Sequence, residues 1–144
     1  MTDRFPKGFD PIQHGLLRKL YGDLVPPFES IRVRPGWWPL VDQMFARLGR
    51  LRDRRNLRVL AIETRYAGHL VVPIDGIATD APDIVYDTEE AARHTCEHCG
   101  KTARLIVKVV LESLLPAPEI ELGDRLLCTD CSHEFKKEIA HDDC

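Results

Sequence analysis

Apolar residues recur at helical spacing in two stretches of the N-terminal half of the chain. The first predicts a short helix over about 14–24, which Pro26 and Pro27 end, after an irregular lead-in over 1–13. The second predicts a longer helix that accommodates Pro39 in its first turn, because that turn has no intrahelical partner for the missing N–H. Its apolar stripe, with polar residues opposite, is predicted to be core: Trp37, Leu40, Val41, Met44, Phe45, Leu48 and Leu51.

The hydrophobic pattern changes after residue 57. β-forming residues over 57–75, interrupted by Ala67-Gly68, predict a β-hairpin. A connecting loop is expected over 80–83. The pattern from Asp87 to Glu90 matches a capping box and predicts a short helix that starts there and continues to about His94.

Four of the five cysteines form two CxxC pairs, which are separated by 28 residues. A two-residue gap lets both thiolates of a pair turn toward one ion, and Gly100 permits the positive φ that such a turn often needs. Two pairs complete a tetrahedral shell with no open position for water, which is typical of a structural zinc site. The predicted ligands of Zn²⁺ are Cys96, Cys99, Cys128 and Cys131. The fifth cysteine, Cys144, ends a polar tail and is assigned no role.

Two other chemistries use cysteines at this spacing. A thioredoxin-like redox site needs one CxxC pair near a βαβ unit, whereas this chain has two pairs and no such unit. Iron in a rubredoxin-like site uses the same four ligands, so the sequence does not distinguish zinc from iron as the bound metal. His98, within the first pair, and His133, after the second, could each replace a cysteine as ligand, but two complete CxxC pairs argue against this and we assign both to the surface.

The segments around the cysteines predict the type of zinc module. Strands are expected over 103–111 and 120–127, and a helix over 132–139 follows the second pair. This order favours a treble clef over a zinc ribbon. The predicted fold class is therefore α+β, with N-terminal helices and a β-hairpin followed by a treble-clef or zinc-ribbon-like subdomain with four cysteine ligands.

The predicted domain organisation has four parts. They are a lead-in with a short helix (1–30), a helix and hairpin core (31–94), the zinc-binding subdomain (95–140) and a tail (141–144). We expect the metal to act as a staple for the third part, because it has few large apolar residues for its length.

Three motifs together resemble a family. Pro35-Gly36-Trp37 before the amphipathic helix, the hairpin segment 62–68 and the CxxCG knuckle at 96–100 resemble a group of small uncharacterised zinc-binding proteins from phages and bacterial genomes. Members show a GW-led helix, a KEK[FY]GG-like hairpin and a second metal half-site. This chain departs from the pattern in the hairpin, where Glu63 and Arg65 replace the lysines. The resemblance implies a zinc site and a phage or mobile-element context, with no established activity.

Charge is distributed unevenly along the chain. Residues 1–58 hold 12 Lys and Arg against 6 Asp and Glu, whereas the rest of the chain holds 8 against 17. Such asymmetry can orient a protein partner or a second copy of the chain. Six arginines lie within twelve residues and are a candidate nucleic-acid-binding surface, with a solvated helix end as the alternative. They are Arg47, Arg50, Arg52, Arg54, Arg55 and Arg58.

The chain contains no nucleophile–base pattern, phosphate-binding glycine loop or catalytic-zinc signature. It also has no apolar stretch long enough for a membrane span and no secretory signal, so we expect a cytoplasmic protein. The leading hypothesis is a non-catalytic, zinc-stabilised interaction protein of phage or mobile-element type that acts through protein or nucleic-acid contacts. The alternative is a small enzyme with its site between the hairpin and the zinc knuckle.

Overall fold

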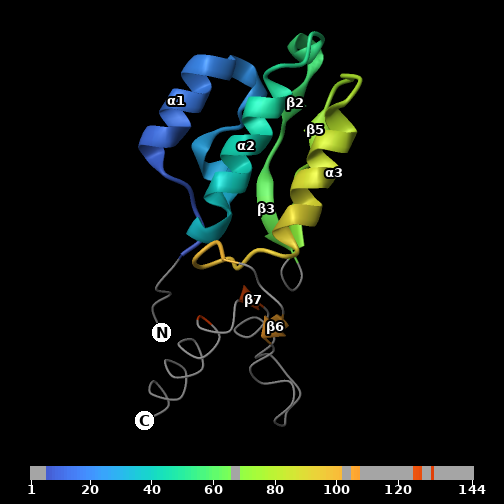
Figure 1. The fold of residues 1–144 in the computed structure, drawn as a ribbon. Coiled ribbons are helices and arrows are strands. Elements are labelled where there is room, and N and C mark those ends of the chain that lie inside the picture. Colours follow the sequence, from blue (N-terminus) through green and yellow to red (C-terminus); the bar gives the residue numbers. More distant parts are fainter. Residues whose placement is uncertain (1–5, 66–68, 102–104, 108–124, 128–130, 132–144) are drawn as a thin grey trace, which may run out of the picture.

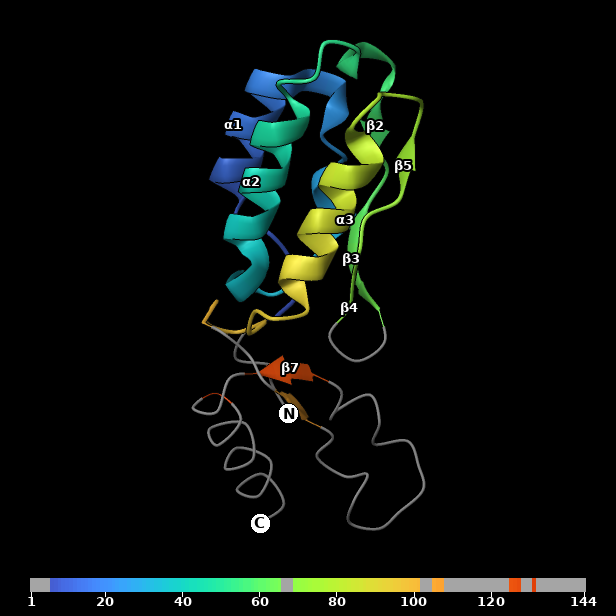
Figure 2. The ribbon, with the colours of Figure 1, turned by 45° about the vertical axis from the view of Figure 1, so that its right-hand side comes forward.

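The computed structural model describes residues 6–65, 69–101, 105–107, 125–127 and 131 of the 144-residue chain. These residues form an α+β structure of helices and small sheets, as predicted. The helices α1, α2 and α3 lie side by side against the strands, and the segment that carries the first cysteine pair passes below the ends of α2 and α3 (Figures 1 and 2). No helix in the described part of the chain is long and apolar enough to cross a membrane.

Helix α1 (Pro11–Tyr21) begins earlier than the sequence predicted. The Asp10 carboxylate accepts a hydrogen bond from the Ile12 amide at 3.0 Å, so Asp10 caps the helix directly before Pro11. The helix ends at Tyr21, and a 3-10 turn (Gly22–Leu24) follows. The predicted bounds of 14–24 and the irregular lead-in as far as residue 13 were therefore wrong, because a local cap outweighed the apolar periodicity.

Helix α2 (Trp38–Leu48) confirms the second predicted helix and its buried stripe. A 3-10 turn (Pro35–Trp37) precedes it, and Pro39 lies in its first turn. Leu51 follows the end of the helix and is partly buried against the core. The fully buried residues of the stripe are Trp37, Val41, Met44, Phe45 and Leu48.

Helix α3 (Ala81–Ala92) corrects two predictions. The helix starts within the stretch 80–83 that was expected to be a loop, with Pro82 in its first turn. The predicted capping box lies inside the helix, where Asp87 contacts Arg47 and Glu89 accepts a hydrogen bond from the Val72 amide at 3.1 Å. These acidic residues serve tertiary contacts, which the local pattern does not distinguish from a cap.

The strands form small sheets. Strands β3 (Ile62–Arg65) and β4 (His69–Val71) pair antiparallel and confirm the hairpin, while β1 (Ile31–Arg32) pairs parallel with β3 in the order β1-β3-β4. Strands β2 (Arg58–Val59) and β5 (Ile74–Asp75) form a second antiparallel pair. Strands β6 (Leu105–Val107) and β7 (Arg125–Leu127) form a third, inside the two strands expected around the metal site.

A cluster of buried residues connects the helices and strands with the first cysteine pair. It extends along the sequence from Phe9 to Cys96, and the partly buried Cys131 packs against it. The predicted boundary between residues 94 and 95 stays a prediction. Among the described cysteines, Cys96 is nevertheless part of this buried cluster and Cys131 packs against it.

Candidate metal centre

The first cysteine pair lies in a tight turn directly after α3. The Cys96 amide donates to the Lys101 carbonyl at 2.7 Å, and the Gly100 amide donates to the Cys96 carbonyl at 3.0 Å. Gly100 has φ of +82°, which confirms the conformation expected of it and disfavours a residue with a side chain there. Residues 96–101, named the knuckle from here on, therefore turn back on themselves.

Three cysteine sulfurs come together at this turn. The ligand atoms of Cys96, Cys99 and Cys131 all lie within 4.8 Å of one another. Sulfur atoms in a tetrahedral zinc site with Zn–S bonds of about 2.3 Å are about 3.8 Å apart, so this arrangement fits one ion after small rotations. Cys96 is buried, Cys131 is partly buried and Cys99 is exposed. This group could therefore hold a metal ion.

The remaining predicted parts of the zinc module lie outside the described residues. Cys128 follows β7 and precedes Cys131, and its position is not described. The same holds for His133, for the tail cysteine Cys144 and for the predicted helix over 132–139 that would distinguish a treble clef from a ribbon. The four-cysteine shell, the treble clef and the identity of the metal stay predictions.

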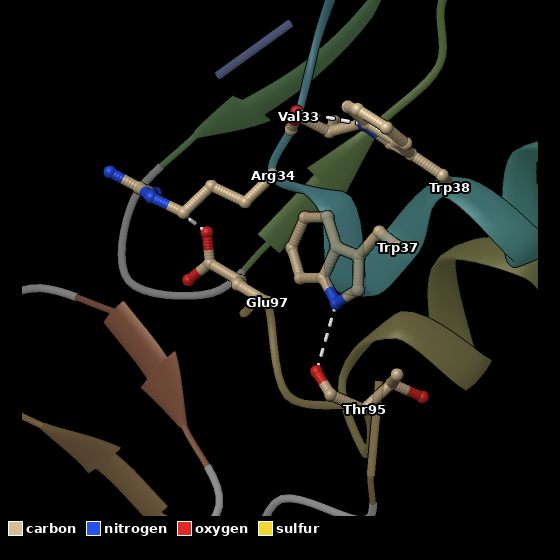
Figure 3. A network of polar contacts seen from close by, with 6 residues as sticks. All are labelled: Val33, Arg34, Trp37, Trp38, Thr95 and Glu97. Carbon is tan, nitrogen blue, oxygen red and sulfur yellow. Dashed lines mark hydrogen bonds and ion pairs between the residues drawn. The ribbon is translucent and has the colours of Figure 1, made fainter. Parts of the chain in front are cut away.

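The turn that precedes α2 packs directly onto the knuckle. The Gly36 amide donates to the Glu97 carbonyl at 2.7 Å, and a Cβ atom at Gly36 would overlap the carbonyl oxygen of Cys96. The Trp37 indole N–H donates to the Thr95 carbonyl at 2.8 Å (Figure 3). Only glycine fits at position 36, so contact with the knuckle and with Thr95 accounts for Gly36 and Trp37 of the Pro35-Gly36-Trp37 motif.

An ion pair crosses the same contact. Nη1 of Arg34 lies 2.9 Å from Oε1 of Glu97, the residue after Cys96, and their side chains are 9% and 0% exposed (Figure 3). Removing one partner from such a buried pair leaves the other charge buried without this contact, which costs far more than the loss of an exposed pair. The pair therefore ties the orientation of the knuckle to the first residues before α2. Sequence reasoning missed it, because charges 63 residues apart leave no local signal.

One histidine assignment needs correction. His98 lies within the first CxxC pair and was expected on the surface, but it is only 8% exposed. Among the described residues it is not part of the group that could bind a metal. The tight turn of the knuckle against the core accounts for its burial.

The six arginines of the candidate nucleic-acid surface have different surroundings. Arg47 makes an exposed ion pair with Asp87 at 3.1 Å. The guanidinium of Arg54 lies 5.7 Å above the centre of the Tyr21 ring, a cation–π distance, and Arg54 is partly buried. The other four, Arg50, Arg52, Arg55 and Arg58, are exposed. Two of the six therefore have structural contacts, and four remain accessible to a phosphate backbone.

A half-open pocket of about 250 Å³ lies between β4 and α3. It lies beside the hairpin, and ionisable side chains line it, but its lining includes no residue of the knuckle, so it is not the site between hairpin and knuckle that the enzyme hypothesis expected. Glu90 lies 3.5 Å from Arg93 and 3.6 Å from His94, and Glu89 accepts the Val72 amide. Several of these charges therefore already have partners within the chain. The lining residues are His69, Leu70, Val71, Tyr86, Glu89, Glu90 and Arg93.

Comparison with family models, with curated proteins and with solved structures found no match to this chain. The resemblance to small phage and bacterial zinc-binding proteins therefore rests on the motifs alone.

Proposed function

We propose that this chain is a non-catalytic interaction protein whose fold is stapled by one zinc ion bound to Cys96, Cys99, Cys128 and Cys131. The observation that carries the proposal is the position of Cys131 beside the first pair, 32 residues away in sequence. Convergence of thiols from two distant segments is expected of a structural site, since the ion then joins parts of the chain that lie far apart in sequence. A shell of four thiolates leaves no coordination position for a substrate.

The surroundings of the cysteines support a structural role. One short segment holds the knuckle and the residue before it: the Gly36 amide bonds to the Glu97 carbonyl, the Trp37 indole bonds to the Thr95 carbonyl, and Arg34 pairs with the Glu97 side chain. Rigid support from neighbouring residues is what a metal site needs to keep its ligands in place. The motif resemblance adds a phage or mobile-element setting to this proposal.

Elemental analysis of the purified chain, followed by X-ray absorption at the zinc edge, tests the proposal. We expect about one zinc per chain and four sulfur neighbours at about 2.3 Å. Cys128→Ser should lose metal or sulfur coordination, whereas Cys144→Ser should retain both. A folded chain without metal, an iron-only native form, or the same loss in both variants would contradict the proposed site.

An enzyme with its site in the pocket between β4 and α3 is the second candidate. Convergent ionisable groups favour it, and the pocket has them. We place it second because Glu89 and Glu90 already have partners within the chain. Small substrates can be titrated into the protein while its NMR spectrum is recorded. Chemical-shift changes centred on His69 and Tyr86 would favour this candidate.

A further inference from the structure

Helix α1 carries an exposed apolar stripe. Ile12, Leu16 and Leu20 are 77%, 50% and 63% exposed, and their spacing of four residues places them on one face of the helix. Only Leu17 of α1 is buried. Single exposed apolar side chains are common on soluble proteins, whereas several that form a contiguous patch often mark an interaction surface.

A glycine lies beside this stripe. Gly15 is exposed in the interior of α1, and a Cβ atom there would meet nothing within 4 Å. Glycine is the least favourable non-proline residue in a helix interior, so α1 loses stability at a position where its own chain does not require glycine. A missing side chain next to an apolar stripe allows a second helix to approach closely, because the distance between packed helices depends on the side chains at the contact.

The two ends of the surface differ in net charge, although Lys7 lies at the acidic end and Asp23 at the basic end. Helices α1 and α2 run in the same direction, since Gln13 bonds to Asp42 at 3.1 Å near their starts and the Tyr21 ring packs against Gly49 near their ends. Asp10 and Asp42 lie close together near the starts of these helices. Burial raises the pKa of the Asp42 carboxyl, and the negative charge of Asp10 raises it further. The exposed cations Lys19 and Arg50 lie at the other end.

We propose that α1 binds a second copy of this chain, in an antiparallel pair of α1 helices centred on Leu16. The proposal rests on the proposed function, since it names the partner of the interaction protein. Ile12 and Leu20 are equally far from Leu16 in sequence. A two-fold rotation about an axis through the Leu16 contact therefore places Ile12 of each copy opposite Leu20 of the other. The same rotation brings Arg50 of each copy toward Asp42 of the other, because both lie on the α2 side of α1, and it opposes the helix dipoles.

The contact is small. An α1 helix of 11 residues is about 16 Å long, so the interface falls in the size range of weak, concentration-dependent association. Sedimentation of the metal-loaded chain should therefore show a mass that rises with concentration from 16.4 kDa toward twice that value. Added salt should reduce the association, because charge pairing contributes to it.

Variants locate the contact. Leu16→Glu should abolish the rise in mass, and Ile77→Glu, which changes an 84% exposed side chain outside α1, should leave it unchanged. Gly15→Ala should weaken association without lowering the unfolding midpoint of the dilute protein. An equal mixture of Ile12→Glu and Leu20→Lys should associate more strongly than either variant alone, because only the antiparallel arrangement places residue 12 opposite residue 20.

Three results would overturn the proposal. They are a wild-type chain that stays monomeric throughout, a dimer that Leu16→Glu leaves intact, and a mixture that shows no rescue. A monomer that Leu16→Glu destabilises would indicate instead that another segment of the same chain covers the stripe. Metal content is measured on every sample, so a monomeric chain with one zinc rejects the dimer and retains the zinc site.

Discussion

The guanidinium of Arg34, just before α2, lies 2.9 Å from the carboxylate of Glu97, within the first cysteine pair, and both side chains are buried. Glu97 directly follows Cys96, so this charge pair connects the proposed metal site with the helical core. The pair combines two large free-energy terms of opposite sign. Desolvation of the two charges is unfavourable, and their electrostatic attraction is strong where water is excluded.

Replacing Arg34 should therefore be severely destabilising. We expect Arg34→Met to lower the free energy of unfolding by about 3 kcal/mol, since it leaves the Glu97 carboxylate buried without this partner. The matched control is Arg65→Met, which breaks an exposed pair with Glu63 at 3.0 Å and should cost less than about 1 kcal/mol. Urea unfolding of the metal-loaded variants measures both. Equal small losses would show that the buried pair contributes no more than the exposed one.

Gly36 provides a second test of the same contact. A side chain there would overlap the Cys96 carbonyl, so Gly36→Ala should push the knuckle away from the core. We expect a loss of stability of about 1 to 3 kcal/mol, in the range of overpacked sites, together with weaker zinc retention against a chelator. Gly8→Ala is the control, because a Cβ atom at Gly8 meets nothing within 4 Å. Unchanged zinc retention in Gly36→Ala would mean that the contact does not support the metal site.

The sequence predicted what local patterns encode and missed what distant contacts decide. The stripe of α2, the hairpin of β3 and β4 and the positive φ of Gly100 follow from periodicity or from steric limits on one residue. The start of α3 was missed, although Pro82 is a normal first-turn residue, because the neighbouring aspartates resembled a loop. Glu89 was assigned to no tertiary contact, because its partner, the Val72 amide, is identified only by the fold.

In the candidate site, too, local features were predicted and contacts between distant segments were not. CxxC spacing alone predicted that Cys96 and Cys99 face one ion, because the turn between them is short. The packing of the Pro35-Gly36-Trp37 motif on the knuckle was not predicted, although both motifs were recognised. No periodic signal relates two turns that meet only after the helices and strands between them have folded.

Asp53 should give the fold a defined pH dependence. Its carboxylate accepts hydrogen bonds from the Thr79 amide at 2.9 Å and from the Thr79 hydroxyl at 3.1 Å, and the bond from the amide is the main cause that lowers its pKa. A lowered folded-state pKa gives stability that is present above the unfolded value of about 3.9 and is lost as the pH falls through the folded value. Asp53→Asn should therefore reduce the urea midpoint at pH 7 and have a smaller effect near pH 3. An equal difference at both pH values would contradict this assignment.

The exposed arginines allow a direct test of nucleic-acid binding. If the segment after α2 binds a phosphate backbone, replacing Arg50, Arg52 and Arg55 by Gln should reduce the slope of log affinity against log salt by about three. Arg47→Gln is the control, since Arg47 is paired with Asp87 and should change the slope less. Fluorescence anisotropy with a labelled DNA duplex measures the slope. No binding at low salt would leave these arginines as a solvated surface.

Metal removal should change the surroundings of the Trp37 side chain. If the metal stabilised only residues 95–140, as the sequence predicts, its removal would affect that segment first and leave the Trp37 region more protected. The structure changes this expectation, because the Trp37 indole donates to the Thr95 carbonyl and Cys96 belongs to the same buried cluster as Trp37. Binding energy at a metal site that forms only on folding becomes folding energy, so its loss should spread to whatever packs on the ligands.

We therefore expect chelation to shift the fluorescence of Trp37 to the red and to speed the exchange of its indole proton. The measurement uses a Trp38→Phe variant, in which Trp37 is the only tryptophan, and Trp38 itself serves as the comparison in a Trp37→Phe variant. The Trp38 indole donates to the Gly8 and Val33 carbonyls at 3.1 and 3.3 Å, both outside the knuckle, and should respond later. An unchanged Trp37 signal after complete removal of the metal would show that the knuckle and the helical core fold independently, whereas simultaneous loss of both signals would show one cooperative unit.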